Sequence, residues 1–218
     1  MKTIHYFIAL TAATLLFSCK SNTGVKTESD TTAVSQGNET EITVPAAVKK
    51  YGIKSGIITF EIDMMGNKQK LVLYFDDFGA KEAEEKFEGE NVKEISLCDG
   101  KDMYNIILSE KVAFTSGSCY RGVAYRFAWD EISEEDQNTR AKKLPNMTVA
   151  GKDCESFSFD MGTTSTVYAG WNSICLYQKT KSQYGDVVRQ AVKIEENATI
   201  PADKFQVPSG YEIKKAGF

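Results

Sequence analysis

Short runs in which apolar and polar residues alternate, separated by turn residues, are the feature that most restricts the fold of this chain. Every second residue from Ile58 to Met64 is apolar, and this is the period of a half-buried strand. Gly66-Asn67 follows, and the run 69–75 returns with a second strand pattern. The two runs therefore predict a β-hairpin.

Further strand-like runs follow at close intervals, at 94–98, 102–108, 112–115, 153–159, 163–168, 174–177 and 186–195. Asp99-Gly100, between the first two of these, is typical of a tight hairpin turn. The charged segment 80–88 fits an exposed strand or a short helix equally well. Because no long helical segments separate the strands, we predict a mainly β fold with minor α content, an antiparallel sheet of about eight to ten strands.

One helix is predicted as an insertion in this sheet, from about Asp130 to Lys143. Asp130 is a possible N-cap, acidic residues fill the first turns, and basic residues close the segment. That order complements the helix dipole. The segment has few apolar residues, so we expect it to lie on the surface or to cover an opening, and Pro145 would end it.

The first residues of the chain have the composition of a secretory signal. Lys2 precedes an apolar run from Ile4 to Phe17, which is shorter than the roughly 20 residues that a membrane-spanning helix needs. The sequence Leu16-Phe17-Ser18-Cys19 resembles the lipobox of bacterial lipoproteins. The resemblance implies that residues 1–18 are removed as a signal peptide and that Cys19 is acylated, so that the membrane is a partner through this residue.

Residues 19–43 form a polar segment that we expect to be a disordered tether, because it has too few large apolar residues to repay its ordering. Within it, Asp30-Thr31-Thr32 resembles the O-glycosylation acceptor motif of Bacteroides-type bacteria, which makes Thr31 a candidate for glycosylation. Residues 44–218 are predicted to form a single antiparallel β domain.

Composition and charge disfavour several classes of function. The chain has a net charge of −4 and no basic cluster, which argues against nucleic acid as a partner. The single histidine is His5, inside the predicted signal peptide. The mature chain would therefore lack the imidazole of hydrolytic triads and of most zinc sites, and we predict neither a metal nor a cofactor.

Carboxylates are the remaining candidates for catalysis. A glycosidase-like pair is an alternative in any acidic β protein, but no feature of the sequence selects one. The turn acids Asp76, Asp77, Asp99 and Asp102 lack the alternating oxygen ligands of a calcium loop. We therefore expect a protein that is not an enzyme, with no catalytic residues assigned.

Four cysteines follow Cys19, namely Cys98, Cys119, Cys154 and Cys175. An even number in an exported protein points to disulfides. The pairs Cys98–Cys119 and Cys154–Cys175 share a separation of 21 residues and are the expected pairing. The alternative is that the cysteines are free, buried thiols.

Large aromatic residues gather in two segments, with Tyr125 and Trp129 in one and Tyr168 and Trp171 in the other. Aromatic side chains usually fill the core of a sheet. The second interpretation is that these four residues line a cavity for an apolar ligand.

Three segments resemble the half-barrel superfamily of the outer-membrane lipoprotein carrier and its membrane-anchored receptor, and also uncharacterised lipoproteins of Bacteroides-type bacteria. They are Tyr51-Gly-Ile-Lys-Ser-Gly-Ile-Ile-Thr-Phe, Tyr74-Phe-Asp-Asp-Phe-Gly79 and Val149-Ala-Gly-Lys-Asp-Cys154. The resemblance implies a curved sheet or half-barrel over about residues 44–213, which holds acyl chains in its concave face.

Together these features predict a lipid-anchored protein of the bacterial cell envelope, most simply of the outer membrane, that binds a lipid or another apolar ligand. The alternative is a structural or protein-interaction lipoprotein without a small-molecule ligand, whose partner is another envelope protein.

Overall fold

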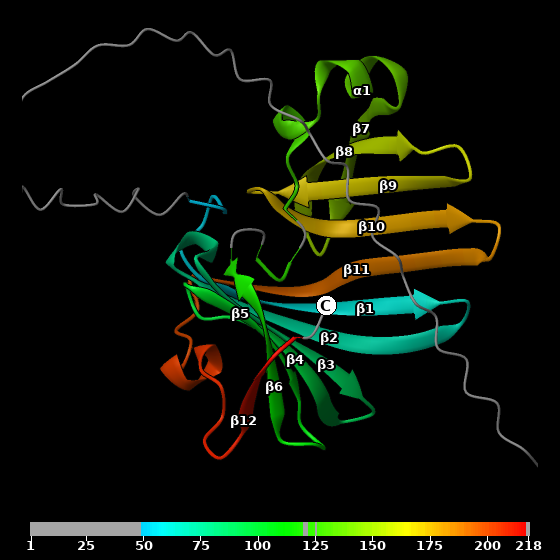
Figure 1. Ribbon diagram of the computed structural model, residues 1–218. Helices are drawn as coiled ribbons and strands as arrows, with labels where there is room; N and C mark the ends of the chain where they lie inside the picture. Colours follow the sequence, from blue (N-terminus) through cyan, green and yellow to red (C-terminus); the bar gives the residue numbers. More distant parts are fainter. Residues whose placement is uncertain (1–48, 120–121, 125, 217–218) are drawn as a thin grey trace, which may run out of the picture. The chain divides into compact units, whose positions relative to one another are not determined.

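The computed structural model describes residues 49–119, 122–124 and 126–216. Twelve strands form one sheet in the order β12-β6-β5-β4-β3-β2-β1-β11-β10-β9-β8-β7, and the sheet curls along this order (Figure 1). The strands are β1 (Gly56–Met64), β2 (Asn67–Asp76), β3 (Lys81–Glu88), β4 (Asn91–Cys98), β5 (Asp102–Ile107), β6 (Val112–Ser118), β7 (Ala141–Val149), β8 (Lys152–Asp160), β9 (Thr164–Trp171), β10 (Ile174–Ser182), β11 (Gly185–Glu196) and β12 (Glu212–Lys215).

The prediction of a mainly β fold built on an antiparallel sheet is confirmed. In the first hairpin, Ile58 pairs with Leu73 and Phe60 with Leu71, so the alternating apolar residues of both strands share one face. The sheet has two more strands than the upper end of the expected range. One of them, β12, forms with β6 the only parallel pair among the described strands. Its residues show no alternation, so no pattern in the sequence indicated this strand.

The charged segment 80–88 forms a strand, β3, with partners on both sides. Glu82 pairs with Phe75 of β2 and with Cys98 of β4. Two sets of backbone hydrogen bonds hold the segment extended, and they settle a choice that local periodicity left open.

The predicted helix is present but much shorter than expected. Helix α1 covers only Glu134–Thr139, and its N-cap is Ser133, whose Oγ accepts from the Asp136 N–H at 3.1 Å. The last three residues of the expected helix, 141–143, instead begin β7, which also contains Pro145. Proline has no N–H to give to a ladder, but β7 is an edge strand and its register shifts between Leu144 and Met147, where a proline is tolerated. Pairing with β8 thus outweighs the helical charge pattern.

Alternate residues along a strand belong to different hydrophobic cores, because their side chains lie on opposite faces of the sheet. Leu73 and Phe75 belong to a core on one face of β1 and β2. Tyr74, which lies between them in the sequence, packs with Ala83 and Leu97 on the opposite face. There the 3-10 helix η4 (Ala202–Phe205) covers the sheet through Phe205. A third cluster, around Phe157, lies on β8 to β10.

One disulfide is present among the described residues and joins Cys98 to Cys119, with Cα atoms 5.5 Å apart. The expected second pair, Cys154–Cys175, does not form, and both cysteines are buried thiols. The reason is topological. Strand β9 separates β8, which carries Cys154, from β10, which carries Cys175, and the two side chains join different apolar clusters.

Candidate functional site

A pocket of about 340 Å³ lies between strands β8 and β9 and the segment that leads into α1. Its wall is almost entirely apolar. The lining residues are Arg126, Phe127, Ala128, Ile132, Phe157, Phe159, Met161, Thr166 and Tyr168. We call this the aromatic pocket.

Aromatic rings in tilted and edge-on contact form much of the wall of the aromatic pocket. Phe157 lies at the centre, with its ring centroid 5.2 Å from Phe127, 5.4 Å from Trp129 and 5.2 Å from Tyr168. Phe157 and Tyr168 are cross-strand partners of β8 and β9, which is why their rings meet. Ring pairs at such distances hold one another in place, so the wall is largely preformed.

The segment over the pocket is fixed at its start. The Phe127 N–H donates to the Ser173 carbonyl at 2.9 Å, and Arg126 forms an isolated β-bridge with Ile174. A Cβ at Gly170 would lie 2.1 Å from Cγ of Phe127, so only glycine at this position lets the ring rest on β9. These contacts place the Phe127 ring in the wall of the pocket.

The pocket offers little chemistry. Its described lining contains no carboxylate, thiol or imidazole. Its one charged residue, Arg126, is exposed and forms an ion pair with Glu131, and the Thr166 hydroxyl is 3.1 Å from that of Thr180. Beside the rings, burial raises the pKa of the Cys175 thiol to about 11, so this thiol stays protonated and unreactive near neutral pH.

The structure brings only part of the predicted wall together. Tyr168 lines the pocket, and Trp129 borders it through its contact with Phe157. Trp171 lies elsewhere, packed against the first core with the Lys152 ammonium 4.6 Å from its ring centroid. Tyr125 lies outside the described residues, as do Cys19 and Thr31.

Among the aromatic residues of the pocket, the predicted wall left out Phe127, Phe157 and Phe159. A usable signal existed for two of them, because Phe157 and Phe159 alternate with serines and so share a face of one strand. Recognising that Tyr168 faces them required the pairing of β8 with β9.

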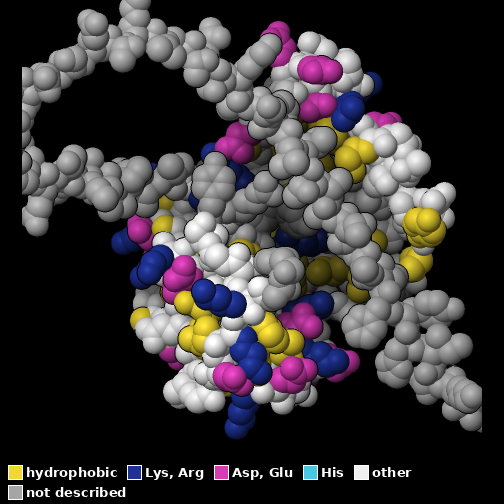
Figure 2. Space-filling view, in the orientation of Figure 1, with side chains coloured by type: hydrophobic (Ala, Val, Ile, Leu, Met, Phe, Trp, Pro, Cys, Tyr) yellow, Lys and Arg dark blue, Asp and Glu magenta, His cyan; other side chains and the backbone are white. Residues whose placement is uncertain are grey.

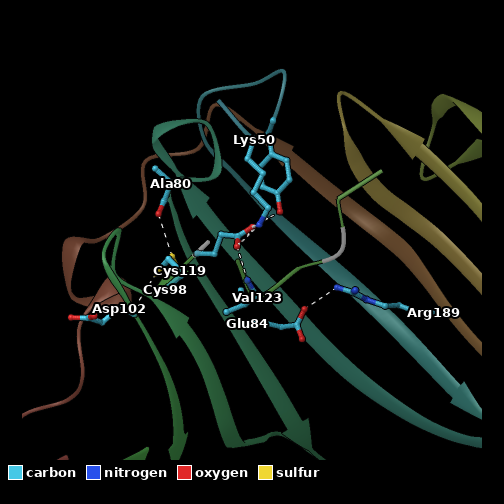
Figure 3. Close-up of polar contacts among 10 residues, drawn as sticks. Lys50, Ala80, Glu84, Cys98, Asp102, Cys119, Val123 and Arg189 are labelled. Atoms are coloured by element: carbon cyan, nitrogen blue, oxygen red, sulfur yellow. Dashed lines mark hydrogen bonds and ion pairs between the residues drawn. A yellow bond between two sulfur atoms is a disulfide. The ribbon is translucent and has the colours of Figure 1, made fainter. Parts of the chain in front are cut away.

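A second arrangement, which the sequence did not indicate, surrounds the carboxylate of Glu82 (Figure 3). Glu82 is fully buried on β3, with 0% of its surface exposed. Lys50 Nζ lies 2.6 Å from both carboxylate oxygens, the Val123 N–H donates at 2.7 Å, and the Tyr51 hydroxyl donates as well. We call these four residues the Glu82 clamp.

The clamp ties two loop segments to the sheet. Lys50 and Tyr51 precede β1, and Val123 follows the disulfide, so three distant parts of the chain meet at one carboxylate. Gly122 has a φ of +66°, and a Cβ there would lie 2.2 Å from a carboxylate oxygen of the buried Glu82, so the position suits glycine. Burial lowers the pKa of Lys50 and raises that of Tyr51. With every oxygen engaged by the chain itself, the clamp is structural.

Another depression, of about 470 Å³, lies near η4, and its lining combines the charged residues Asp76, Lys81 and Asp99 with apolar residues of η4 and its neighbours. These acids hold turns: Asp76 accepts from the N–H of Asp77, and Asp99 accepts from the N–H groups of Lys101 and Asp102. The mixed charges and the turn hydrogen bonds make this depression a weaker candidate for a binding site than the aromatic pocket.

No helix among the described residues is both long and apolar enough to cross a membrane. No family model matches the sequence, and no curated protein matches it either.

Solved structures do resemble the chain. An uncharacterized conserved protein from Thermus thermophilus superposes with a TM-score of 0.52 at 8% identity, over 75% of this chain and 91% of that one. A structure of MucB gives 0.49 at 11% identity, over 75% of this chain and 61% of that one. The complex of Pseudomonas aeruginosa MucA and MucB gives 0.43 at 11% identity, over 74% and 58%. The first likeness concerns the fold alone, and the TM-scores of the other two do not establish a common fold.

Proposed function

We propose that this protein is a binding module that takes a lipid or another apolar molecule into the aromatic pocket. One observation carries the proposal: the pocket of about 340 Å³ has a wall of preformed aromatic rings with no carboxylate or thiol in its described lining. Small-molecule sites are typically concave, apolar and of about 300 to 1,000 Å³. The pocket lies at the lower end of this range, which suits a medium-length acyl chain or a small ring system.

The proposed setting is the bacterial cell envelope, with the domain held at a membrane by acylation of Cys19. The lipobox resemblance of Leu16-Phe17-Ser18-Cys19 supports this part of the proposal. The polar composition of residues 19–43 supports a tether between the anchor and the β domain. The role we propose in this setting is binding without catalysis, and the largely apolar, aromatic lining of the pocket supports it.

Uptake of a fluorescent fatty acid tests the proposal directly. The probe is dansyl-labelled undecanoic acid, titrated into the unacylated chain of residues 20–218. We expect saturable binding that Ala128→Phe reduces at least about tenfold, because the added ring would occupy the pocket that Ala128 lines. Native mass spectrometry of the same protein is expected to show a co-purified lipid.

Ala216→Phe is the matched control. Ala216 is half-buried like Ala128 but lies after β12, outside the pocket lining. The control variant is expected to bind the probe like the parent chain. A clean apo mass together with no saturable uptake would refute ligand binding, and equal losses in both variants would show that the probe binds elsewhere.

A further inference from the structure

Three hairpin tips at one end of the sheet expose large apolar side chains. Met65 lies between β1 and β2, Tyr184 between β10 and β11, and Met161 between β8 and β9. Their exposed fractions are 73%, 80% and 61%, the highest of all the exposed large hydrophobic residues in the described chain. The three most exposed large apolar side chains thus lie at the same end of the sheet, whereas incidental exposed apolar residues are scattered singly over a surface.

The three tips are neighbours in the sheet, whose order includes the series β2-β1-β11-β10-β9-β8. At this end Met64 pairs with Val187, and Ser182 pairs with Thr164. A Cβ at Gly185 would lie 2.6 Å from Sδ of Met65, so the methionine rests against the adjoining turn. Figure 2 shows hydrophobic side chains at the edge of the molecule where the β1–β2 and β10–β11 tips lie in Figure 1.

The conformation of Met65 is unusual for its residue type. Met65 and Gly66 have φ values of 55° and 87°, as in the two-residue turns that favour Asn-Gly or Asp-Gly. A methionine in this left-handed conformation is strained, and a polar residue would be favoured on both conformational and solvation grounds. An exposed apolar side chain at such a position points to a function that needs it.

The tips are held in shape and carry little net charge. The Gly66 N–H donates to Asp63 Oδ1 at 2.7 Å, and the Gly162 N–H donates to Asp160 Oδ1 at 2.7 Å. Lys179 forms an ion pair with Asp186 at 3.2 Å. A partner recognised here is therefore recognised by apolar contact, which suits the interface of a bilayer better than an acidic or basic protein surface.

We propose that these three hairpin tips, which we call the tip surface, dock onto a lipid bilayer. Met161 belongs to both the tip surface and the lining of the aromatic pocket, so a bilayer at the tips lies beside the pocket. This inference builds on the proposed function, because docking gives an apolar ligand a route between membrane and pocket that avoids water.

The length of the chain before the domain permits this arrangement. The Lys50 N–H donates to the carbonyl of Phe78, which follows the end of β2. The described chain therefore begins at the end of β1 that is opposite the tips. A nine-residue strand such as β1 is roughly 30 Å long. The chain from Cys19 to Lys49 can extend to roughly 100 Å. An acylated Cys19 and the tip surface can therefore meet the same membrane.

The test is sedimentation of the unacylated chain of residues 20–218 with vesicles of phosphatidylethanolamine and phosphatidylglycerol. The variant Met65→Ser/Tyr184→Ser removes apolar surface from two tips and leaves every lining residue of the pocket unchanged. We expect its vesicle affinity to fall about tenfold. Because apolar contact dominates, binding by the parent chain should change little between about 0.05 M and about 0.5 M salt.

Val192→Ser/Ile213→Ser is the matched control, since these residues are also exposed, at 47% and 57%, but lie away from the tips. The control should bind vesicles like the parent chain. Absence of vesicle binding by the parent chain, or an equal loss in the control, would overturn the proposal. A dimer in size-exclusion chromatography that only the tip variant dissociates, without vesicle binding, would instead assign the surface to a second copy.

The same variants separate this proposal from ligand binding. Met65→Ser/Tyr184→Ser should take up dansyl-labelled undecanoic acid from solution like the parent chain, whereas Ala128→Phe should keep its vesicle affinity. If neither the parent chain nor any variant takes up the fatty acid, while Met65→Ser/Tyr184→Ser alone loses affinity for vesicles, ligand binding is refuted and membrane docking is supported.

Discussion

The sheet carries the Glu82 clamp on one half, at β3, and the aromatic pocket on the other half, at β8 and β9. We call them the clamp half and the pocket half. Both sites lie on the same face of the sheet, but one is charged and the other is apolar. In the clamp half, three chain segments converge on the buried carboxylate of Glu82. In the pocket half, the Phe127 side chain packs against the aromatic rings around Phe157. Between them, Arg189 of β11 forms an ion pair with Glu84 at 2.8 Å and lies 4.1 Å from the ring centroid of Phe60.

The difference shows where a ligand can be accommodated. A buried charge is tolerated only when it is paired and hydrogen-bonded, so the clamp half must be filled by its own donors. Ring contacts are less demanding, because a gap beside apolar groups leaves no polar atom without a partner. The 340 Å³ pocket accordingly lies in the apolar half.

The largest expected effect comes from removing the carboxylate of the clamp. Glu82→Ala leaves the Lys50 ammonium buried without its partner and deprives two further donors of their acceptor. We expect the free energy of unfolding, measured by urea denaturation, to fall by about 4 kcal/mol.

Glu88→Ala is the control, because the Glu88–Lys93 ion pair is exposed on both sides. Its expected loss is at most about 0.5 kcal/mol. If Glu82→Ala is too unstable to purify, Tyr51→Phe removes one donor and should cost about 1 to 2 kcal/mol. Equal stabilities for the Glu82 and Glu88 variants would show that the clamp does not hold this half together.

The Cys98–Cys119 disulfide is expected to have the next largest effect, and only on the clamp half. It closes a separation of 21 residues, and the Gly122 N–H donates to the Cys119 carbonyl at 2.9 Å, just before Val123 reaches Glu82. Cys98→Ala/Cys119→Ala should lower the free energy of unfolding by about 3 kcal/mol.

The control for this variant is reducing agent. Reduction should destabilise the parent chain by a similar amount and leave the variant unchanged, while uptake of the fluorescent fatty acid persists in both. A loss of uptake with no loss of stability would mean that the disulfide supports the pocket rather than the clamp.

The sheet could be predicted because most of the information that specifies it is local. Alternation and turn residues located the hairpins, as in the Ile58–Leu73 pairing of β1 and β2. The strand at 141–149 could not be predicted in this way, because the helical charge order is local and pairing with β8 is not.

The sites depend on contacts between distant residues, which is why they were harder to predict. Glu82 is surrounded by charged residues in the sequence, and its burial follows from segments 32 and 41 residues away. Tyr168 and Trp129 were identified as ligand-wall candidates from their type. Trp171 was grouped with them but packs against the first core, because an odd number of steps along a strand changes the face. Exposure at the hairpin tips likewise has no local signature in the sequence.

The smallest expected effect is a dependence of the free energy of unfolding on pH, which arises in the pocket half. In the pocket half, burial raises the pKa of the Cys175 thiol from 9.0 to about 11. Between these values the unfolded chain releases a proton that the native protein keeps, so stability falls as pH rises through this range. At pH 11 this single group should reduce the free energy of unfolding by about 2 kcal/mol relative to neutral pH.

Cys175→Ala isolates this contribution, because every other group that titrates at alkaline pH is common to both proteins. The difference in urea midpoint between parent and variant should therefore be constant up to about pH 9. Above that pH the midpoint of the parent should fall relative to the midpoint of the variant. Cys154→Ala provides a comparison in the first core, where burial also raises the thiol pKa. A constant gap for Cys175→Ala up to pH 11 would mean that water reaches this thiol, and with it the base of the aromatic cluster. The pocket would then be wetter than its lining indicates, and the contrast between the two halves would weaken.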